Sequence, residues 1–410
     1  MVPRQNLFAA AAGKLKCKPR RTGEAKMRQI KVFGLYGLIG LAALPGSAMA
    51  QSTTPQGVKN DAVLTTDFED LASGGLRPGG TVLNDLELTS VWTGPDGWDA
   101  HGNIIGDAGG PFSLRRVGDV QGVSNIDTTP AWRLYEAYVR RFYDNGHLVS
   151  SFGIMNLNNV FDVQKYAKLF INASQGIGPE FSQTRPSVFP ISGLGTMTSW
   201  IIDDKNTIKV GLFDGVSGDP DHRTVFVSVK FRKAFGYNYL SEYKRTFDGG
   251  SFKLDHWGYT APSPRLDGQG LQRKNDGTFA QLAVTLTHER QDPNQGLKTW
   301  LRYGVANKNL EEIDQYRGFG LYYVGPFKNR DTDQLGFAIA QAHFGMPYRA
   351  ITAAQGPYET TYELTYAGPV HHGITIQPDL QYVEHPYGQA AIPNAVVIDL
   401  RTVIDFAGGA

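Results

Sequence analysis

The chain closes with VVIDLRTVIDF at residues 396–406, where apolar and polar side chains alternate. Alternate side chains of a β-strand point to opposite faces of its sheet. One face of this segment carries apolar residues and Thr402, whereas the other carries Asp399, Arg401 and Asp405. A soluble sheet with one buried face gives the same alternation. The segment therefore predicts a strand, and the rest of the chain must decide between a soluble sheet and a membrane barrel.

The same alternation recurs along most of the chain. Further candidate strands are 62–71, 81–93, 98–106, 132–142, 147–156, 194–202, 205–213, 236–246, 250–259, 279–290, 297–306, 316–324, 335–344, 358–366 and 373–383. We tally fifteen good or fair strands. Because bacterial barrels usually close with an even number of strands, we expect a sixteenth in the loop 214–235, where residues 224–230 alternate, or at 307–315.

The N-terminus has the pattern of an export signal. A basic start at Met27 precedes an apolar run from Val32 to Leu44, and AMA at 48–50 is a small-x-small cleavage site. The run is too short for a membrane-spanning helix, which needs roughly 20 residues. We therefore predict an N-terminal extension and signal peptide at 1–50, with the signal at 27–50, and a single domain at 51–410.

Removal of residues 1–50 changes the charge and the thiol content. That segment holds nine Lys/Arg and one Glu, so the remainder has 31 basic and 38 acidic residues and a net charge of −7. Nucleic-acid binding, which needs a basic surface, is disfavoured. The only cysteine, Cys17, also lies in this segment, so the predicted domain has no disulfide or cysteine metal site.

Short and long connections alternate between the candidate strands. Gly, Asp and Asn mark short turns at 94–97, 144–146, 203–205 and 248–250, and the long connections are 107–131, 157–193, 214–235, 260–278 and 384–395. Strands of this kind behind an export signal are typical of outer-membrane barrels. The predicted fold is all-β: a closed antiparallel transmembrane β-barrel of sixteen strands with short periplasmic turns and long outer loops. Within the longest loop, 161–171 has some helical period.

The motifs of common enzymes do not occur in the sequence. We find no Gly-x-Ser-x-Gly elbow, His-Glu-x-x-His, phosphate loop or dinucleotide fingerprint. The clusters 219–222 (DPDH) and His371–His372 could bind a metal, but a polar loop and a short turn explain them more simply. We predict neither a metal site nor a cofactor, and no enzyme activity.

The polar face of each alternating strand predicts which residues line the pore. Charged and amide side chains on this face are Glu136, Arg140, Arg302, Glu363, Asp379, Gln381, Asp399 and Arg401. Mixed donors and acceptors suit neutral polyols, but inward charges also pair with one another and stiffen a barrel. The loop 157–193 adds candidate constriction residues, Phe161, Asp162, Lys165, Tyr166 and Lys168. Its aromatic side chains would stack on sugars or pin the loop to the wall.

Several segments occur in the order typical of one known family. They are SGGLRPG at 73–79, VQGVSNI at 120–126, RLYEA at 133–137, NNVFD at 158–162, LFINAS at 169–174, GLFDG at 211–215 with GDP at 218–220, LRYG at 301–304, DTDQLG at 331–336, YELTY at 362–366 and QPDLQYV at 377–383. The sequence resembles the carbohydrate-selective porins of Gram-negative outer membranes, the OprB family, from about residue 73 to 406. In this family the first segment is usually longer; here 61–71 is short and acidic.

The resemblance implies a 16-stranded barrel that passes small sugars such as glucose by diffusion, with inward-folded loops forming a constriction. It also implies contact with outer-membrane lipid and with the barrel assembly machinery through the C-terminal strand. Three alternatives stay open: a general or organic-acid-selective porin, a barrel-embedded outer-membrane enzyme, and a secreted β-sandwich binding protein. The sequence does not specify an oligomeric state.

Overall fold

A computed structural model describes residues 56–230, 233–290, 292–352 and 356–407. These residues belong to one compact unit. The predicted extension and signal peptide at 1–50 lie outside the described residues. Among the residues described, no helix is both long and apolar enough to cross a membrane.

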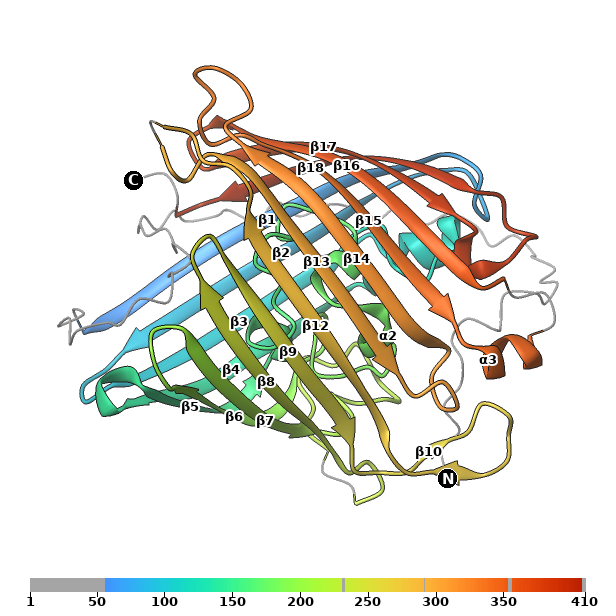
Figure 1. Cartoon of the computed structure of the whole chain (residues 1–410), viewed down its shortest axis with the longest axis horizontal. Helices are drawn as coiled ribbons and strands as arrows, with labels where there is room; N and C mark the ends of the chain where they lie inside the picture. The colour runs from blue at the N-terminus through green and yellow to red at the C-terminus, as the bar shows by residue number, and fades with distance from the viewer. Residues whose placement is uncertain (1–55, 231–232, 291, 353–355, 408–410) are drawn as a thin grey trace, which may run out of the picture. The chain divides into compact units, whose positions relative to one another are not determined.

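Sixteen antiparallel strands of the described chain form a closed barrel (Figure 1). They are β1 (Gly57–Ser73), β2 (Gly79–Thr93), β3 (Trp98–Ala108), β4 (Ala131–Tyr143), β5 (Leu148–Met155), β6 (Gly193–Ile201), β7 (Asn206–Asp214), β8 (Tyr237–Phe247), β9 (Gly250–Tyr259), β12 (Asn275–Thr285), β13 (Gly296–Ala306), β14 (Ile313–Val324), β15 (Gln334–Phe344), β16 (Tyr358–His371), β17 (Ile374–Glu384) and β18 (Ala395–Asp405). Each pairs with its neighbours in the chain, and β1 pairs with β18 to close the ring. Closure leaves no sheet edge with unpaired backbone groups.

The seam between β1 and β18 is long and regular. Its register runs from Val63 opposite Asp405 to Leu71 opposite Val397, and it places Asp67 opposite Arg401 and Glu69 opposite Asp399. The short, acidic first segment predicted at 62–71 thus forms a complete strand that pairs on both sides.

The predicted facing of the last strand is confirmed. Ile398 and Leu400 are 51% and 42% exposed on the outer surface, whereas Asp399 between them is 1% exposed. A shift of one residue would exchange these faces, because side chains alternate along a strand. The same parity gives the other strands their exposed apolar outer side chains, including Phe152, Val210, Leu254, Leu301 and Leu364.

Two sequence-based expectations are wrong. No additional strand forms at 224–230 or 307–312; the candidate ranges, counted with 396–406, already number sixteen. The stretch 161–171 also forms no helix. Its backbone instead follows an irregular path, because groups of the barrel wall bond its carbonyls and amides, as described below.

Connections differ between the two ends of the barrel. One end carries both described chain termini and the turns 94–97, 144–147, 202–205, 248–249 and 372–373, with longer connections at 286–295 and 325–333. The other end carries the connections 109–130, 156–192, 215–236, 260–274, 345–357 and 385–394, with shorter ones at 74–78 and 307–312. Short helices α1 (Ala173–Gly176), α2 (Pro179–Ser182) and α3 (Met346–Ile351) and the small ribbon β10 (Ser263–Pro264) with β11 (Leu271–Gln272) lie in these loops. The alternation of short and long connections is thus largely as predicted.

Candidate functional site

Two loops from the same end fold into the lumen: the β3–β4 loop (109–130) and the β5–β6 loop (156–192). The second reaches far around the wall, because Lys209 of β7, Lys253 of β9 and Gln377 of β17 donate hydrogen bonds to the carbonyls of Val160, Val163 and Leu169 at 2.8, 2.8 and 2.6 Å. Its helix α2 lies against β13 and β14 (Figure 1). Inward folding of the longest loop is therefore present in the structure.

Arg302 of β13 is the main charged anchor of the β5–β6 loop. Its guanidinium donates to Asp162 at 2.7 Å and contacts Glu180 of α2 at 2.8 Å, and all three side chains are fully buried. The cation lies 4.3 Å from the ring centre of Phe279 and 5.2 Å from that of Tyr316. Burial raises the pKa of the Asp162 carboxyl to about 6, and the adjacent guanidinium of Arg302 opposes that rise.

The β3–β4 loop and the β5–β6 loop bond to each other and to the same wall. Asn125 N donates to Ile171 O at 2.9 Å. Gln381 of β17 contacts both loops: its amide nitrogen donates to Val123 O at 2.7 Å, and its oxygen accepts from Asn172 at 3.0 Å. Glu363 of β16 accepts from the backbone amides of residues 171 and 172. One wall thus fixes two loops in contact.

The remaining predicted strand residues also have identified contacts. Glu136 accepts from the amide of Asn156 at 2.9 Å, where the β5–β6 loop begins. Arg140 is half-buried and forms a bidentate pair with Asp99, with Nη2 2.7 Å from the carboxylate. Arg401 pairs with Asp67 at 2.7 Å and donates to Asn125, while Asp379 accepts from Gln381 at 2.9 Å. Most of the predicted lining residues therefore position loops or pair with charges.

The aromatic side chains of the β5–β6 loop face the wall. Phe161 is 0% exposed and packs edge-on against Phe213 of β7, and Phe170 packs against Trp300 of β13. Tyr166 is 6% exposed, with its hydroxyl 2.9 Å from that of Thr285. The aromatic side chains therefore pin the loop to the wall, and the ring of Phe161 is too buried to offer a face to a sugar.

Two lysines of the same loop are accessible. Lys165 and Lys168 are exposed, and the Lys165 ammonium lies 4.8 Å from the ring centre of Tyr166. Lys298 of β13 approaches the rings of Tyr166 and Tyr322 at 5.9 and 5.6 Å. The sequence analysis did not include Lys298 among the lining residues, although Lys298 lies on the same inward face of β13 as Arg302.

Inward charges are distributed unevenly around the barrel: one arc carries mainly carboxylates, whereas the opposite arc carries both signs, with Glu242 paired to Lys209 and Lys253. Inward lysines come from consecutive strands, Lys209 of β7, Lys244 of β8 and Lys253 of β9. Half-way around the ring lie inward carboxylates of β16, β17, β18, β1 and β2, which are Glu363, Asp379, Asp399, Asp67, Glu69 and Asp85.

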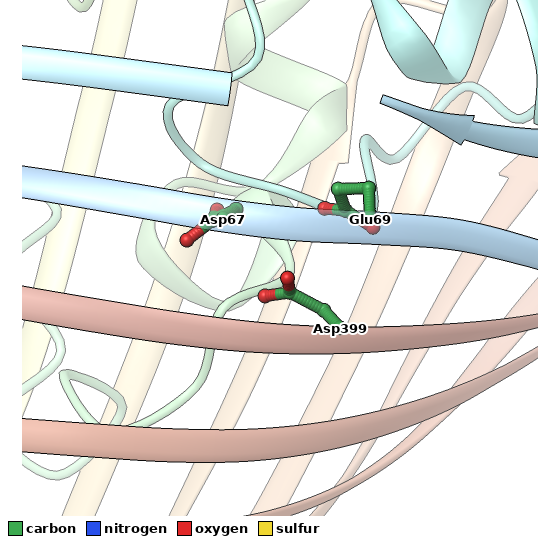
Figure 2. A group of neighbouring side chains, drawn as sticks. All are labelled: Asp67, Glu69 and Asp399. Carbon is green, nitrogen blue, oxygen red and sulfur yellow. The ribbon is translucent and has the colours of Figure 1, made fainter. Parts of the chain in front are cut away.

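One group of carboxylates has the composition of a cation site. Oxygens of Asp67, Glu69 and Asp399 lie within 4.8 Å of one another (Figure 2). The clusters considered from sequence differ from it. Asp219 pairs with Lys230 and His222 in the β7–β8 loop, whereas His371 at the end of β16 and His372 in the following turn are exposed.

Residues 81–406 match the family described as carbohydrate-selective porin, OprB family. The chain belongs to the OprB family of carbohydrate-selective porins. This confirms the resemblance drawn from the ordered motifs, and together with the closed barrel it assigns the protein to the porins of the outer membrane rather than to secreted sandwiches.

Individual relatives are distant. Porin B of Pseudomonas aeruginosa is 26% identical over 142 residues, a match that covers 30% of this chain and 31% of that protein. The putative porin QuiX of Acinetobacter baylyi is 20% identical over 411 residues, covering 87% of this chain and 91% of the relative. The high-pH structure of Pseudomonas putida OprB superposes with a TM-score of 0.75 at 19% identity, over 85% of this chain and 94% of that one. This last similarity confirms the fold.

Proposed function

We propose that this OprB-family barrel lets small neutral sugars diffuse passively across the outer membrane. The observation that carries the proposal is the polar lumen narrowed by two mutually bonded loops. Its accessible groups include the donors Lys165 and Arg140, and amides and carboxylates supply acceptors. A sugar needs both kinds of partner when it loses part of its hydration shell.

The proposal includes the finer expectations from sequence. The end with short turns faces the periplasm, the long loops face outward, and the domain 51–410 acts as a channel rather than an enzyme. The exposed outer side chains of β18 contact lipid, and this strand is the segment that the barrel assembly machinery recognises.

Solute flux tests the main proposal. Liposomes with the purified protein should swell in glucose and other monosaccharides faster than in uncharged solutes of equal size that lack a polyol pattern, with no hydrolysed product. Equal rates for solutes of equal size would contradict sugar preference and support a general porin. Product formation would support an enzyme.

A second candidate, uptake of small hydroxylated carboxylates, is favoured by the lysines. Lys165, Lys168 and Lys298 would attract a carboxylate, whereas the buried carboxylates opposite lie behind the β3–β4 loop. Comparing glucose with gluconate flux decides between the candidates, because the two differ mainly in charge. Lys165→Gln/Lys298→Gln should reduce gluconate flux and leave glucose flux nearly unchanged. The matched control is Lys205→Gln, in the exposed β6–β7 turn at the end of the barrel with the short turns.

A further inference from the structure

Three carboxylates form one row across the closing seam of the barrel. Glu69 of β1 lies opposite Asp399 of β18, and Asp399 lies opposite Asp379 of β17. Like charges directly opposite in a sheet destabilise it. The adjacent row holds Asp67 opposite Arg401, whose guanidinium is the single cation among these side chains.

Two of these carboxylates make no ion pair at contact distance among the described residues. Glu69 and Asp399 are 2% and 1% exposed, and among the described residues neither has a hydrogen-bond partner for either carboxylate oxygen. Arg401 instead makes both of its short contacts with Asp67. Burial of an unpaired carboxylate costs several kcal/mol or more, so these groups need compensation, either from a bound cation or from protonation.

The surroundings prevent water from supplying that compensation freely. The next inward residues of the two strands, Leu71 and Val397, belong to a buried apolar cluster with Val117 and Val123 of the β3–β4 loop. The same loop places Ser124 Oγ 2.7 Å from Asp67. The carboxylates thus lie under a folded loop and beside apolar side chains.

Their geometry points to a hard divalent cation. The ligand set contains only oxygens, which suit Ca²⁺ and Mg²⁺ and disfavour zinc or copper. Ca²⁺–oxygen distances of about 2.3–2.6 Å place opposite ligands about 4.6–5.2 Å apart, whereas Mg²⁺ requires about 4.0–4.2 Å. The oxygens of Asp67, Glu69 and Asp399 lie within 4.8 Å of one another, so all three can reach one ion. Ca²⁺ is favoured because it tolerates an irregular ligand arrangement, whereas Mg²⁺ demands near-ideal octahedral geometry.

We propose that Asp67, Glu69 and Asp399 bind one Ca²⁺ ion that joins the first and last strands of the barrel. In Figure 2, Asp399 projects from β18 toward the two β1 carboxylates. Asp67 can serve the ion while paired with Arg401, because a carboxylate offers about four lone-pair sites. Together with Arg401, these three carboxylates carry a net charge of −2, which the ion neutralises. The proposal is independent of which solute the pore passes.

Calcium binding to the full-length barrel in lipopolysaccharide-free detergent tests the proposal. After chelation, isothermal titration should show one saturable Ca²⁺ per chain, and Ca²⁺ should raise the unfolding temperature until that site is filled. Glu69→Gln/Asp399→Asn should lose the binding and the shift. Asp70→Asn, the matched control on the outer face of the same strand, should keep both.

A reversal of stability order gives a sharper readout. In chelator the double variant should unfold at a higher temperature than the wild type, because it lacks the repelling charges, and Ca²⁺ should reverse that order. Absence of a saturable site in the wild type would overturn the proposal, as would unchanged binding in an assembled double variant. Stabilisation by acid alone, with no Ca²⁺ effect, would show that protons compensate the carboxylates and would also overturn it.

Terbium provides a measurement that needs no variant. Bound Tb³⁺, displaced by Ca²⁺, should show luminescence lifetimes in H₂O and D₂O that indicate few coordinated waters, because protein oxygens occupy most positions. A nearly fully hydrated ion would identify an adventitious surface contact and overturn the proposal.

Discussion

Replacing Arg302 with Met should loosen the β5–β6 loop and widen the pore. The guanidinium bonds Asp162 and Glu180, both on this loop and both fully buried. Methionine keeps an unbranched apolar stem but leaves two buried carboxylates without their cation. Removing one partner of a buried ion pair costs about 3–5 kcal/mol.

This cost falls mainly on the attachment of the loop, because the barrel ladder does not depend on Arg302's side chain. At about 1.4 kcal/mol per factor of ten, the equilibrium for local detachment of the segment around Asp162 should rise about a hundredfold to several thousandfold. Other anchors, such as the bond from Gln377 to Leu169 O, still hold the loop. We therefore expect higher mean conductance with added gating noise, rather than a permanently open barrel.

Single-channel recordings in planar bilayers measure this effect. Asp162→Asn/Glu180→Gln in the Arg302→Met background should restore much of the quiet, wild-type conductance, because it neutralises the stranded carboxylates. Arg317→Met is the matched control, since Arg317 is exposed on the outer face of the neighbouring strand. Unchanged conductance and noise in a properly assembled Arg302→Met protein would refute the assignment of Arg302 as a loop anchor.

Three further predictions concern the loop, the outer face and the N-terminus. Deleting the central part of the 156–192 loop should raise conductance and reduce the difference between sugars and other solutes of equal size, measured by liposome flux. Leu400→Arg should cost roughly 2–4 kcal/mol in urea unfolding if it lies near the bilayer midplane, while Asp399→Asn, compared in the presence of chelator, should cost little; the opposite order would reverse the assigned faces. N-terminal sequencing of the membrane-fraction protein should begin at Gln51, and a retained 1–50 would contradict the signal prediction.

The barrel strands could be predicted from sequence because the alternation of apolar and polar side chains can be recognised within each strand. In Ala395–Asp405, each side chain's face follows from its parity alone, and a one-residue error would reverse every assignment. The exact ends of a strand also depend on the strands it pairs with. The candidate strand 279–290, for example, is Asn275–Thr285 in the structure, where it pairs with β9 from Tyr259 onward. The missing helix at 161–171 has the same origin, because distant wall residues bond its backbone.

The inner arrangement depends on contacts that no local pattern contains. Asp67 and Arg401 are 334 residues apart in sequence and meet only because the barrel closes. Parity indicated that Asp399 faces inward, but not that Glu69 lies opposite it. The inward fold of the β3–β4 loop likewise depends on remote partners, including Gln381 and Glu359, so sequence identified only the longer loop.

We expect the residues that set pore width to differ from the residues that meet the solute. Arg302, Glu363 and Gln381 hold loops, so their substitution should change flux for all solutes by similar factors. Lys165 and Lys168 are exposed on the loop that those anchors hold, so neutralising either lysine should change the ratio between charged and neutral solutes of equal size, with little change in conductance noise. Flux ratios for glucose and gluconate, measured beside noise for Lys168→Gln and Gln381→Leu, test this division. A changed solute ratio in the anchor variant alone would show that the lysines do not contact the solute and that loop position determines selectivity.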